Sequence, residues 1–195
     1  MADSLYWMSR YLERAEHTAR VIDINLHVSI DQSEQSLQRR WDHVARSLDG
    51  TAVAPRLERD PQAFSEAIAL DSADPGSIAA CILSARRNAR EVREHASAEM
   101  WEQINRLYLF VSNPKANEQW NRDVHGFLTE IVEGARLFRG LTDATMSHNE
   151  GWHFIQLGLF IERVTNTLNL LDAHFDGRTI GRPHDGAMPV DDYLE

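Results

Sequence analysis

Two glutamate–arginine pairs lie near opposite ends of the chain, Glu13-Arg14 and Glu162-Arg163. In each copy an aspartate follows after eight intervening residues. A glutamate can act as a general acid or base, and an arginine can hold a carboxylate or phosphate through two parallel hydrogen bonds. The repeated pair is therefore the first candidate for a binding or catalytic site.

Apolar side chains accompany both pairs at alternating steps of three and four residues. The first stripe consists of Leu5, Met8, Leu12, Ala15, Ala19, Ile22 and Leu26. The second stripe consists of Phe154, Leu157, Ile161, Val164, Leu168, Leu171 and Phe175. This spacing places one face of an α-helix in a core. We therefore predict two long helices that are related by an internal repeat, each with its stripe buried.

The charged pairs fall beside these stripes. At 100° per residue, Glu13 and Arg14 lie on opposite flanks of the first stripe. One interpretation is structural, with salt bridges from Glu13 to Arg163 and from Glu162 to Arg14 across a pseudo-twofold axis. The other interpretation is a polar site assembled where the two repeats meet.

An enzymatic site here would use the acid–base side chains Glu13, Glu16 and His17, with arginines holding a substrate carboxylate. A di-metal carboxylate site needs Glu-x-x-His on two helices. Here Glu13 and His17 are four residues apart, and the second copy has Asn166 in place of a histidine. We therefore expect no metal and no cofactor, and no catalytic residue can be named. Cys81 is expected to be a buried structural cysteine.

A third charged group lies in the middle of the chain. Arg86, Arg90 and Arg93 follow i, i+4, i+7 spacing and precede Trp101. Two interpretations are open in a chain of net charge −10. These arginines either neutralise the glutamates inside the bundle or form a pocket for an anion such as a carboxylate or phosphate.

Composition limits the class of protein. The net charge of −10 argues against a nucleic-acid partner. No segment approaches the ~20 apolar residues of a membrane span, and charged residues interrupt the apolar N-terminal stretch, unlike a signal peptide. A single cysteine in 195 residues fits a reducing compartment. We expect a cytoplasmic protein.

Start and stop signals predict helices over most of the chain. Their approximate ranges are 4–30, 37–48, 61–70, 75–96, 97–113, 120–140 and 149–176. No stretch of β-branched residues alternates with a period of two, so the predicted fold is an all-α multi-helix bundle. The bundle occupies residues 1–176. Residues 177–195 read as an exposed linker and the start of a truncated helix.

Three segments of the sequence resemble the bacterial alpha-E family, a helical domain named for a Glu-Arg motif. These segments are residues 2–20, residues 84–95 together with 99–105, and residues 150–163, so the resemblance reaches from the first residues to about residue 172. The first segment is the most specific. Family members usually begin a few residues earlier and continue beyond residue 195, which fits a truncated last helix.

The resemblance implies a role beside circularly permuted ATP-grasp ligases and transglutaminase-like peptidases in peptide synthesis or modification. It transfers no catalytic role. The residues that match the naming motif are Glu13, Arg14, Glu162 and Arg163, and those that match the middle segment are Arg86, Arg90, Arg93 and Trp101.

The function we expect is a non-catalytic accessory or binding module for an ATP-grasp-type ligase. The alternative is an enzyme with a Glu/His/Arg site inside the bundle, acting on a carboxylate- or amide-containing substrate. Partner candidates are the ligase, a transglutaminase-like peptidase and a second copy of the chain. Candidate residues for ligand or partner binding are Glu13, Arg14, Glu16, His17, Arg86, Arg90, Arg93, Trp101, Glu162 and Arg163.

Overall fold

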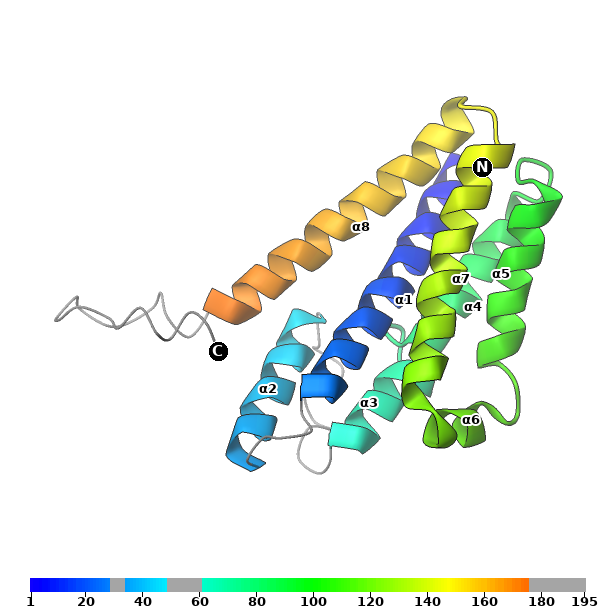
Figure 1. Cartoon of the computed structure of the whole chain (residues 1–195). Helices are drawn as coiled ribbons and strands as arrows, with labels where there is room; N and C mark the ends of the chain where they lie inside the picture. The colour runs from blue at the N-terminus through cyan, green and yellow to red at the C-terminus, as the bar shows by residue number, and fades with distance from the viewer. Residues whose placement is uncertain (29–33, 49–60, 176–195) are drawn as a thin grey trace, which may run out of the picture.

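A computed structural model describes residues 1–28, 34–48 and 61–175, which form eight α-helices and no strand (Figure 1). The helices are α1 (Ala2–Val28), α2 (Glu34–Ser47), α3 (Pro61–Leu70), α4 (Ile78–Glu91), α5 (Ala98–Val111), α6 (Ala116–Arg122), α7 (Val124–Thr145) and α8 (Glu150–Phe175). The all-α fold, with a long motif-bearing helix near each end of the chain, is confirmed. The predicted linker and truncated helix over 177–195 lie outside the described residues.

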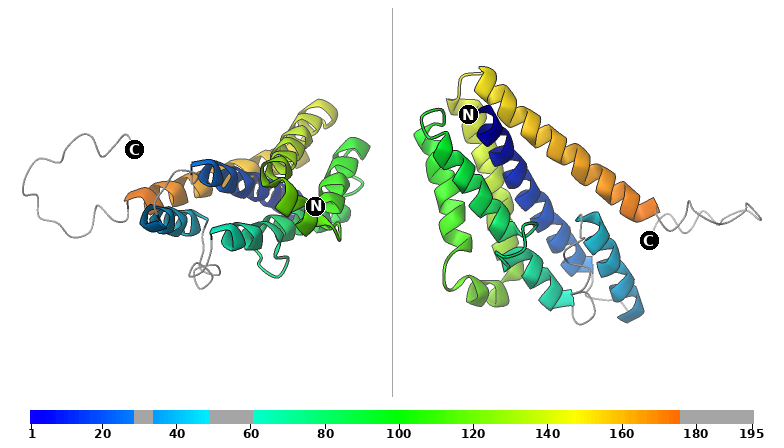
Figure 2. Two further views of the ribbon diagram at one scale, coloured as in Figure 1. Left: turned by 60° about the horizontal axis from the view of Figure 1, so that its bottom comes forward. Right: turned by 180° about the vertical axis from the view of Figure 1, so that it is seen from behind.

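Helix α1 is the centre of the bundle and packs against α8, α4 and α7. Figure 2 shows that α8 runs beside α1 in the same direction, while α4, α5 and α7 lie on the other side of α1. The predicted apolar stripe of α1 is confirmed, since six of its members are buried and Leu26 packs partly against the core. Those six are Leu5, Met8, Leu12, Ala15, Ala19 and Ile22.

Short polar side chains set the starts of several helices, as expected for N-caps. Ser97 accepts from the backbone N–H of Met100 at 3.2 Å, and Asn149 accepts from that of Gly151 at 3.0 Å, both at the predicted positions. The predicted start of α4 at residue 75 is wrong. Asp74 instead closes a turn on the N–H of Gly76, and Ser77 caps α4.

The helix predicted over 120–140 is two helices in the structure. Asp123 separates them with a non-helical backbone (φ −156°, ψ 83°), and its carboxylate accepts from the N–H of Gly126 at 2.8 Å. Gly140 does not end α7, which continues to Thr145. A glycine inside a helix costs only about 1 kcal/mol, and tertiary packing of the flanking turns outweighs that cost.

The predicted burial of the apolar stripe on α8 is wrong. Large side chains of that stripe, such as Val164 and Leu168, are exposed. The buried face of α8 consists of Gly151, Ile155, Gly158, Leu159, Glu162, Asn166 and Ala173. Gly158 explains why this face of α8 packs against α1. A Cβ at this position would lie 2.3 Å from the carbonyl oxygen of Tyr6, so only a glycine permits the close approach. Small residues allow α8 to approach α1 more closely than the large apolar residues would.

Crossing a bilayer requires a helix that is both long and strongly apolar. Among the described residues, no helix meets both requirements.

Candidate functional site

Glu162 is the most enclosed carboxylate of the two Glu-Arg pairs, with a side chain 1% exposed. Two arginines of α1 reach it from the same helix face. Arg10 donates from Nε to Oε2 at 2.6 Å, and Arg14 donates from Nε to Oε1 at 2.6 Å. Each oxygen of the carboxylate is therefore held by a charged donor.

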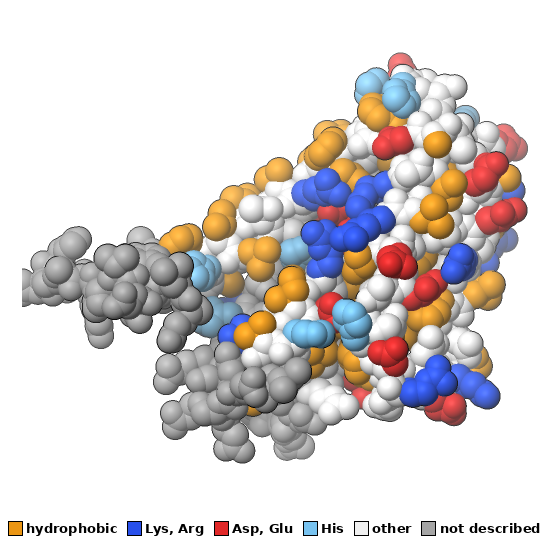
Figure 3. All heavy atoms as spheres, viewed as in Figure 1, with side chains coloured by type: hydrophobic (Ala, Val, Ile, Leu, Met, Phe, Trp, Pro, Cys, Tyr) orange, Lys and Arg blue, Asp and Glu red, His pale blue; other side chains and the backbone are white. Residues whose placement is uncertain are grey.

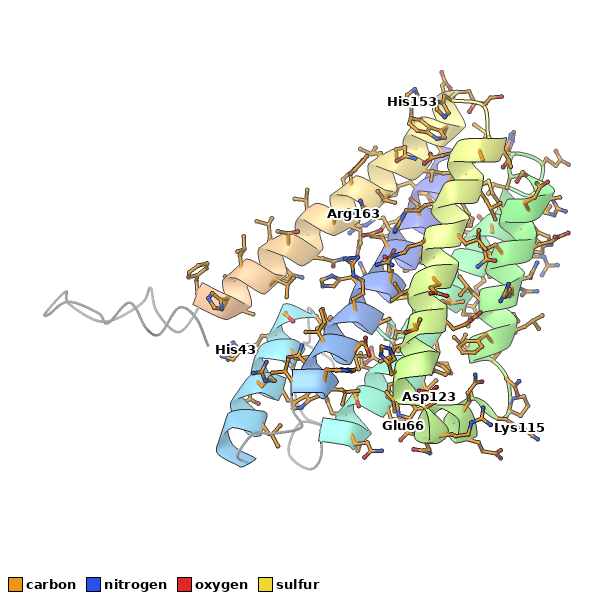
Figure 4. All side chains as sticks on the ribbon, viewed as in Figure 1. His43, Glu66, Lys115, Asp123, His153 and Arg163 are labelled. Carbon is orange, nitrogen blue, oxygen red and sulfur yellow. The ribbon has the colours of Figure 1, made fainter. Side chains whose placement is uncertain are left out.

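Glu13 makes the reciprocal contact. Arg163 of α8 donates from Nε to Oε1 of Glu13 at 2.7 Å, and Arg139 of α7 donates to Oε2 at 3.0 Å. Figure 4 shows Arg163 on the side of α8 that faces α1. The predicted crossed salt bridges, Glu13 with Arg163 and Glu162 with Arg14, are confirmed.

Glu16 joins α7 to the same network. Its buried carboxylate contacts Arg139, which also binds Glu13, and it lies 3.3 Å from Arg20 and 3.5 Å from Arg136. Sequence reasoning missed Arg136 and Arg139. Their spacing places them on α7 near its buried residues, but nothing in the sequence indicates that α7 packs against α1.

Aromatic side chains hold the arginines of α1 in place. The guanidinium carbon of Arg10 lies 5.0 Å from the ring centre of Trp7, and its Nη1 donates to the hydroxyl of Tyr6 at 3.0 Å. Burial alone would lower the pKa of Arg14, but its hydrogen bond and ion pair with Glu162 raise that pKa overall. Sequence reasoning also missed Arg10. It lies four residues, about one helical turn, before Arg14, and that spacing could have shown that both arginines share one face of α1.

His17 lies beside this network, one turn after Glu13. It is half-buried, and its Nε2 is buried without a hydrogen-bond partner. Burial, followed by the nearby charge of Arg20, lowers the pKa of His17 below its ordinary value of 6.5. The ring is therefore neutral at pH 7.

A small cavity adjoins the network between α1, α7 and α8. Its volume is about 20 Å³, and its wall includes Glu13, Arg139, Ser9 and Gln156. That space holds about one water molecule. A substrate cannot enter it without movement of the helices.

The predicted arginine group of α4 does not neutralise the buried glutamates. Arg86 instead donates to Oδ1 of Asn105 at 2.6 Å, and its guanidinium carbon lies 4.2 Å from the ring centre of Tyr108. Arg93 stacks near Trp101 at 5.4 Å, and Arg90 is exposed. Arg86 and Arg93 thus lie against side chains of α5, whereas arginines of α1, α7 and α8 bind the buried glutamates.

Cys81 is fully buried in α4, as predicted. Its thiol lies 3.6 Å from the carbonyl oxygen of Pro75, and burial raises the pKa of Cys81 to about 12. A thiol with that pKa is neutral at pH 7 and is not a nucleophile.

A separate cluster near the end of α1 was also missed. Asp23, His27 and His125 place their possible ligand atoms within 4.8 Å of one another. His125 contacts Asp23 at 2.7 Å, and this hydrogen bond raises the pKa of His125. Asp23 and His27 are four residues apart on α1, but His125 comes from the start of α7. The sequence does not indicate that the start of α7 lies near the end of α1.

Residues 1–194 match the sequence model of Alpha-E, described as a predicted alpha-helical domain with a conserved ER motif. The chain belongs to the Alpha-E family. In this Alpha-E chain, both Glu-Arg pairs lie at the contact of α1 with α8, and each pair binds the other. No curated protein and no solved structure matches the chain.

Proposed function

We propose that this Alpha-E chain is a non-catalytic accessory module of the cytoplasm. It docks an ATP-grasp-type ligase, or the peptide that such a ligase makes or modifies. The family resemblance supports this class of partner, and a transglutaminase-like peptidase is the second class that it implies. The contacts of the charged network support a binding role rather than a catalytic one.

The buried carboxylates favour a structural task. A general acid or base must exchange a proton with a substrate within hydrogen-bond reach. Glu162 is enclosed and engaged by Arg10 and Arg14, while Glu13 and Glu16 share Arg139. The adjoining cavity, whose wall includes Glu13, holds about one water molecule and leaves no room for a substrate beside that carboxylate.

The main support for the proposal is that arginines outnumber glutamates in this network. Three glutamates of the network, Glu13, Glu16 and Glu162, face six arginines. The surplus is three positive charges in a chain of net charge −10. We call the outer members of the network the arginine face; they are Arg20, Arg136, Arg139 and Arg163.

The arginine face lies at the surface between α7 and α8 (Figure 3). Arg20 and Arg136 are more than half exposed, and their contacts to Glu16 are the longest of the network at 3.3 Å and 3.5 Å. Each guanidinium group carries five N–H donors, so donors remain outside the contact with Glu16 that can bind carboxylates of a partner. Arg10 and Arg14 link α1 to Glu162 of α8. The arginine face places positive charge at the surface.

Co-purification with quantitative mass spectrometry tests the proposal. The tagged chain, recovered from its own host, is expected to bring an ATP-grasp ligase in stoichiometric amount. The double variant Arg20→Gln, Arg136→Gln should lower that recovery several-fold and reduce its dependence on salt, because exposed charges act through screened attraction. Arg106→Gln is the matched control, since Arg106 is exposed and paired with Glu130 on the surface.

Three results would count against the proposal. In the first, the chain is recovered without a partner. In the second, the recovered partner is unrelated to ligases and peptidases. In the third, the double variant binds the partner as well as the unchanged chain does. The third result would remove the arginine face as the docking site even if the partner is recovered.

A second function is favoured by one observation at His17. A buried imidazole nitrogen without a partner is costly, and such a group is a candidate acid–base catalyst. In an enzyme, this residue would exchange a proton with a carboxylate- or amide-containing substrate bound to the arginine face. His17→Gln would then abolish turnover by the reconstituted ligase system, whereas an accessory module would leave turnover intact.

A further inference from the structure

The outer face of α8 exposes large apolar side chains along most of its length. Figure 3 shows them as a row on the edge of the molecule. Their exposed fractions lie between 37% and 59%. The members are Leu157, Phe160, Ile161, Val164, Leu168, Leu171 and Phe175. A contiguous row of this size marks an interaction surface rather than the usual scatter of apolar side chains.

Six of these side chains follow the spacing of a coiled coil. From Leu157 to Phe175 the steps are four, three, four, three and four. We call these six residues the α8 seam; they are Leu157, Ile161, Val164, Leu168, Leu171 and Phe175. Strict alternation of this kind gives a narrow stripe that another helix covers by knobs-into-holes packing. The seam lies about 150° around the helix from the face that contacts α1. In the part of the chain that the structure describes, its members from Leu157 to Leu171 are accordingly exposed.

The seam is symmetric about residue 166. In an antiparallel pairing centred there, Val164 lies opposite Leu168 of a second copy, and Leu168 lies opposite Val164. The same pairing joins Ile161 to Leu171 and Leu157 to Phe175. An interface with a twofold axis requires this kind of self-complementary surface. Antiparallel helices also oppose their macrodipoles favourably.

Charge permits two copies to meet here. The chain carries a net charge of −10, so most of its surfaces repel a second copy. The seam contains no ionisable residue, and the positions that flank it contribute only Asp172 and His174. The paired stretch would be about 27 Å long at 1.5 Å per residue.

We propose that the α8 seam is the homodimer interface of this chain, formed with the α8 seam of a second copy in antiparallel orientation. The inference is independent of the docking function, because it uses a different face of α8. The arginine face remains available in the dimer for a carboxylate-bearing partner.

Light scattering and sedimentation of the purified chain test the inference. The unchanged chain is expected at twice the 22.3 kDa mass of one copy. Val164→Asp and Leu168→Asp should each shift the population to single copies, since a buried unpaired charge at the centre of the seam is costly. Both residues are 59% exposed in one copy, so the helical circular dichroism should stay unchanged.

The control is Leu109→Asp on α5. Leu109 is 66% exposed and lies outside the seam, so this variant should remain a dimer. Orientation is tested with cysteines. A mixture of the Val164→Cys and Leu168→Cys variants should form mixed disulfides faster than either variant alone, because only the mixture aligns two cysteines in the antiparallel pairing.

Four outcomes would overturn the inference. The unchanged chain is a single copy throughout the micromolar range, or it forms a dimer that survives both aspartate substitutions. Alternatively, the chain stays a single copy and uses the seam to bind lipid vesicles or the ligase. Faster crosslinking of either variant alone would reject the antiparallel orientation.

Discussion

Arg163 and Glu13 are 150 residues apart in sequence, and Arg163 Nε donates to Oε1 of Glu13 at 2.7 Å. The reciprocal contact joins Arg14 to Glu162 at 2.6 Å. Adjacent residues on a helix point about 100° apart, so the members of a Glu-Arg pair cannot bind one another. Each pair instead offers one anion and one cation to the other helix. Two such pairs at the same level of parallel helices satisfy each other.

Glu162→Gln should destabilise the fold by about 3 kcal/mol, because it leaves the arginine charges at positions 10 and 14 partly buried without their anion. Urea denaturation followed by circular dichroism measures the change in the free energy of unfolding. The same substitution at Glu130, whose partner Arg106 is largely exposed, should cost less than about 1 kcal/mol. Equal effects at both positions would show that the buried network does not hold the helices together.

Gly158→Ala should destabilise the fold by about 2 kcal/mol through overpacking. The new Cβ would lie 2.2 Å from Ser9 Oγ and 2.3 Å from the carbonyl oxygen of Tyr6. The hydroxyl can move, but the backbone oxygen cannot move without displacing α1. Truncation of the serine, Ser9→Ala, should therefore fail to rescue the variant, as measured by thermal unfolding.

Gly140→Ala is the matched control for that prediction. Gly140 lies inside α7, and a Cβ there meets no atom within 4 Å. This substitution should stabilise the fold by about 0.5–1 kcal/mol through helix propensity. If both alanine variants gain stability, the close approach of α8 to α1 is wrong.

The sequence predicts the central part of this site and misplaces the rest for a physical reason. Periodicity identifies α1 and its buried stripe, and flanking positions identify the crossed pairs Glu13–Arg163 and Glu162–Arg14. Periodicity does not show which apolar stripe a neighbour covers. On α8 the close approach at Gly158 turns small and polar residues toward α1 and the apolar seam toward the surface. Arg139 was missed because the packing of α7 on α1 depends on long-range contacts.

The pKa of His17 predicts a loss of stability in mild acid. Burial and Arg20 lower this pKa below 6.5 in the folded chain, whereas the unfolded chain keeps the ordinary value. As pH falls through about 6.5, the unfolded state therefore takes up the proton first and becomes favoured. The loss grows until pH passes the lowered pKa and is constant below it.

His17→Gln removes this contribution. Its free energy of unfolding should fall less than that of the unchanged chain between about pH 7.5 and pH 5. His153→Gln, which removes an exposed histidine, should follow the unchanged chain. NMR titration of the ring gives a direct check, and a midpoint at or above 6.5 for His17 would contradict the burial argument.

The single cysteine offers a probe of unfolding and of the dimer. Cys81 is buried, and its pKa of about 12 leaves almost no thiolate near neutral pH. A thiol reagent should therefore modify the native chain at least about a thousand-fold more slowly than the urea-unfolded chain, in line with a typical stability of a folded domain. Leu109→Cys should add one site that reacts at once, which controls for reagent activity. Because the buried Cys81 cannot reach a second copy, the expected dimer should keep its mass in reducing agent. A dimer that dissociates on reduction would show that a disulfide, and not the α8 seam, joins the two copies.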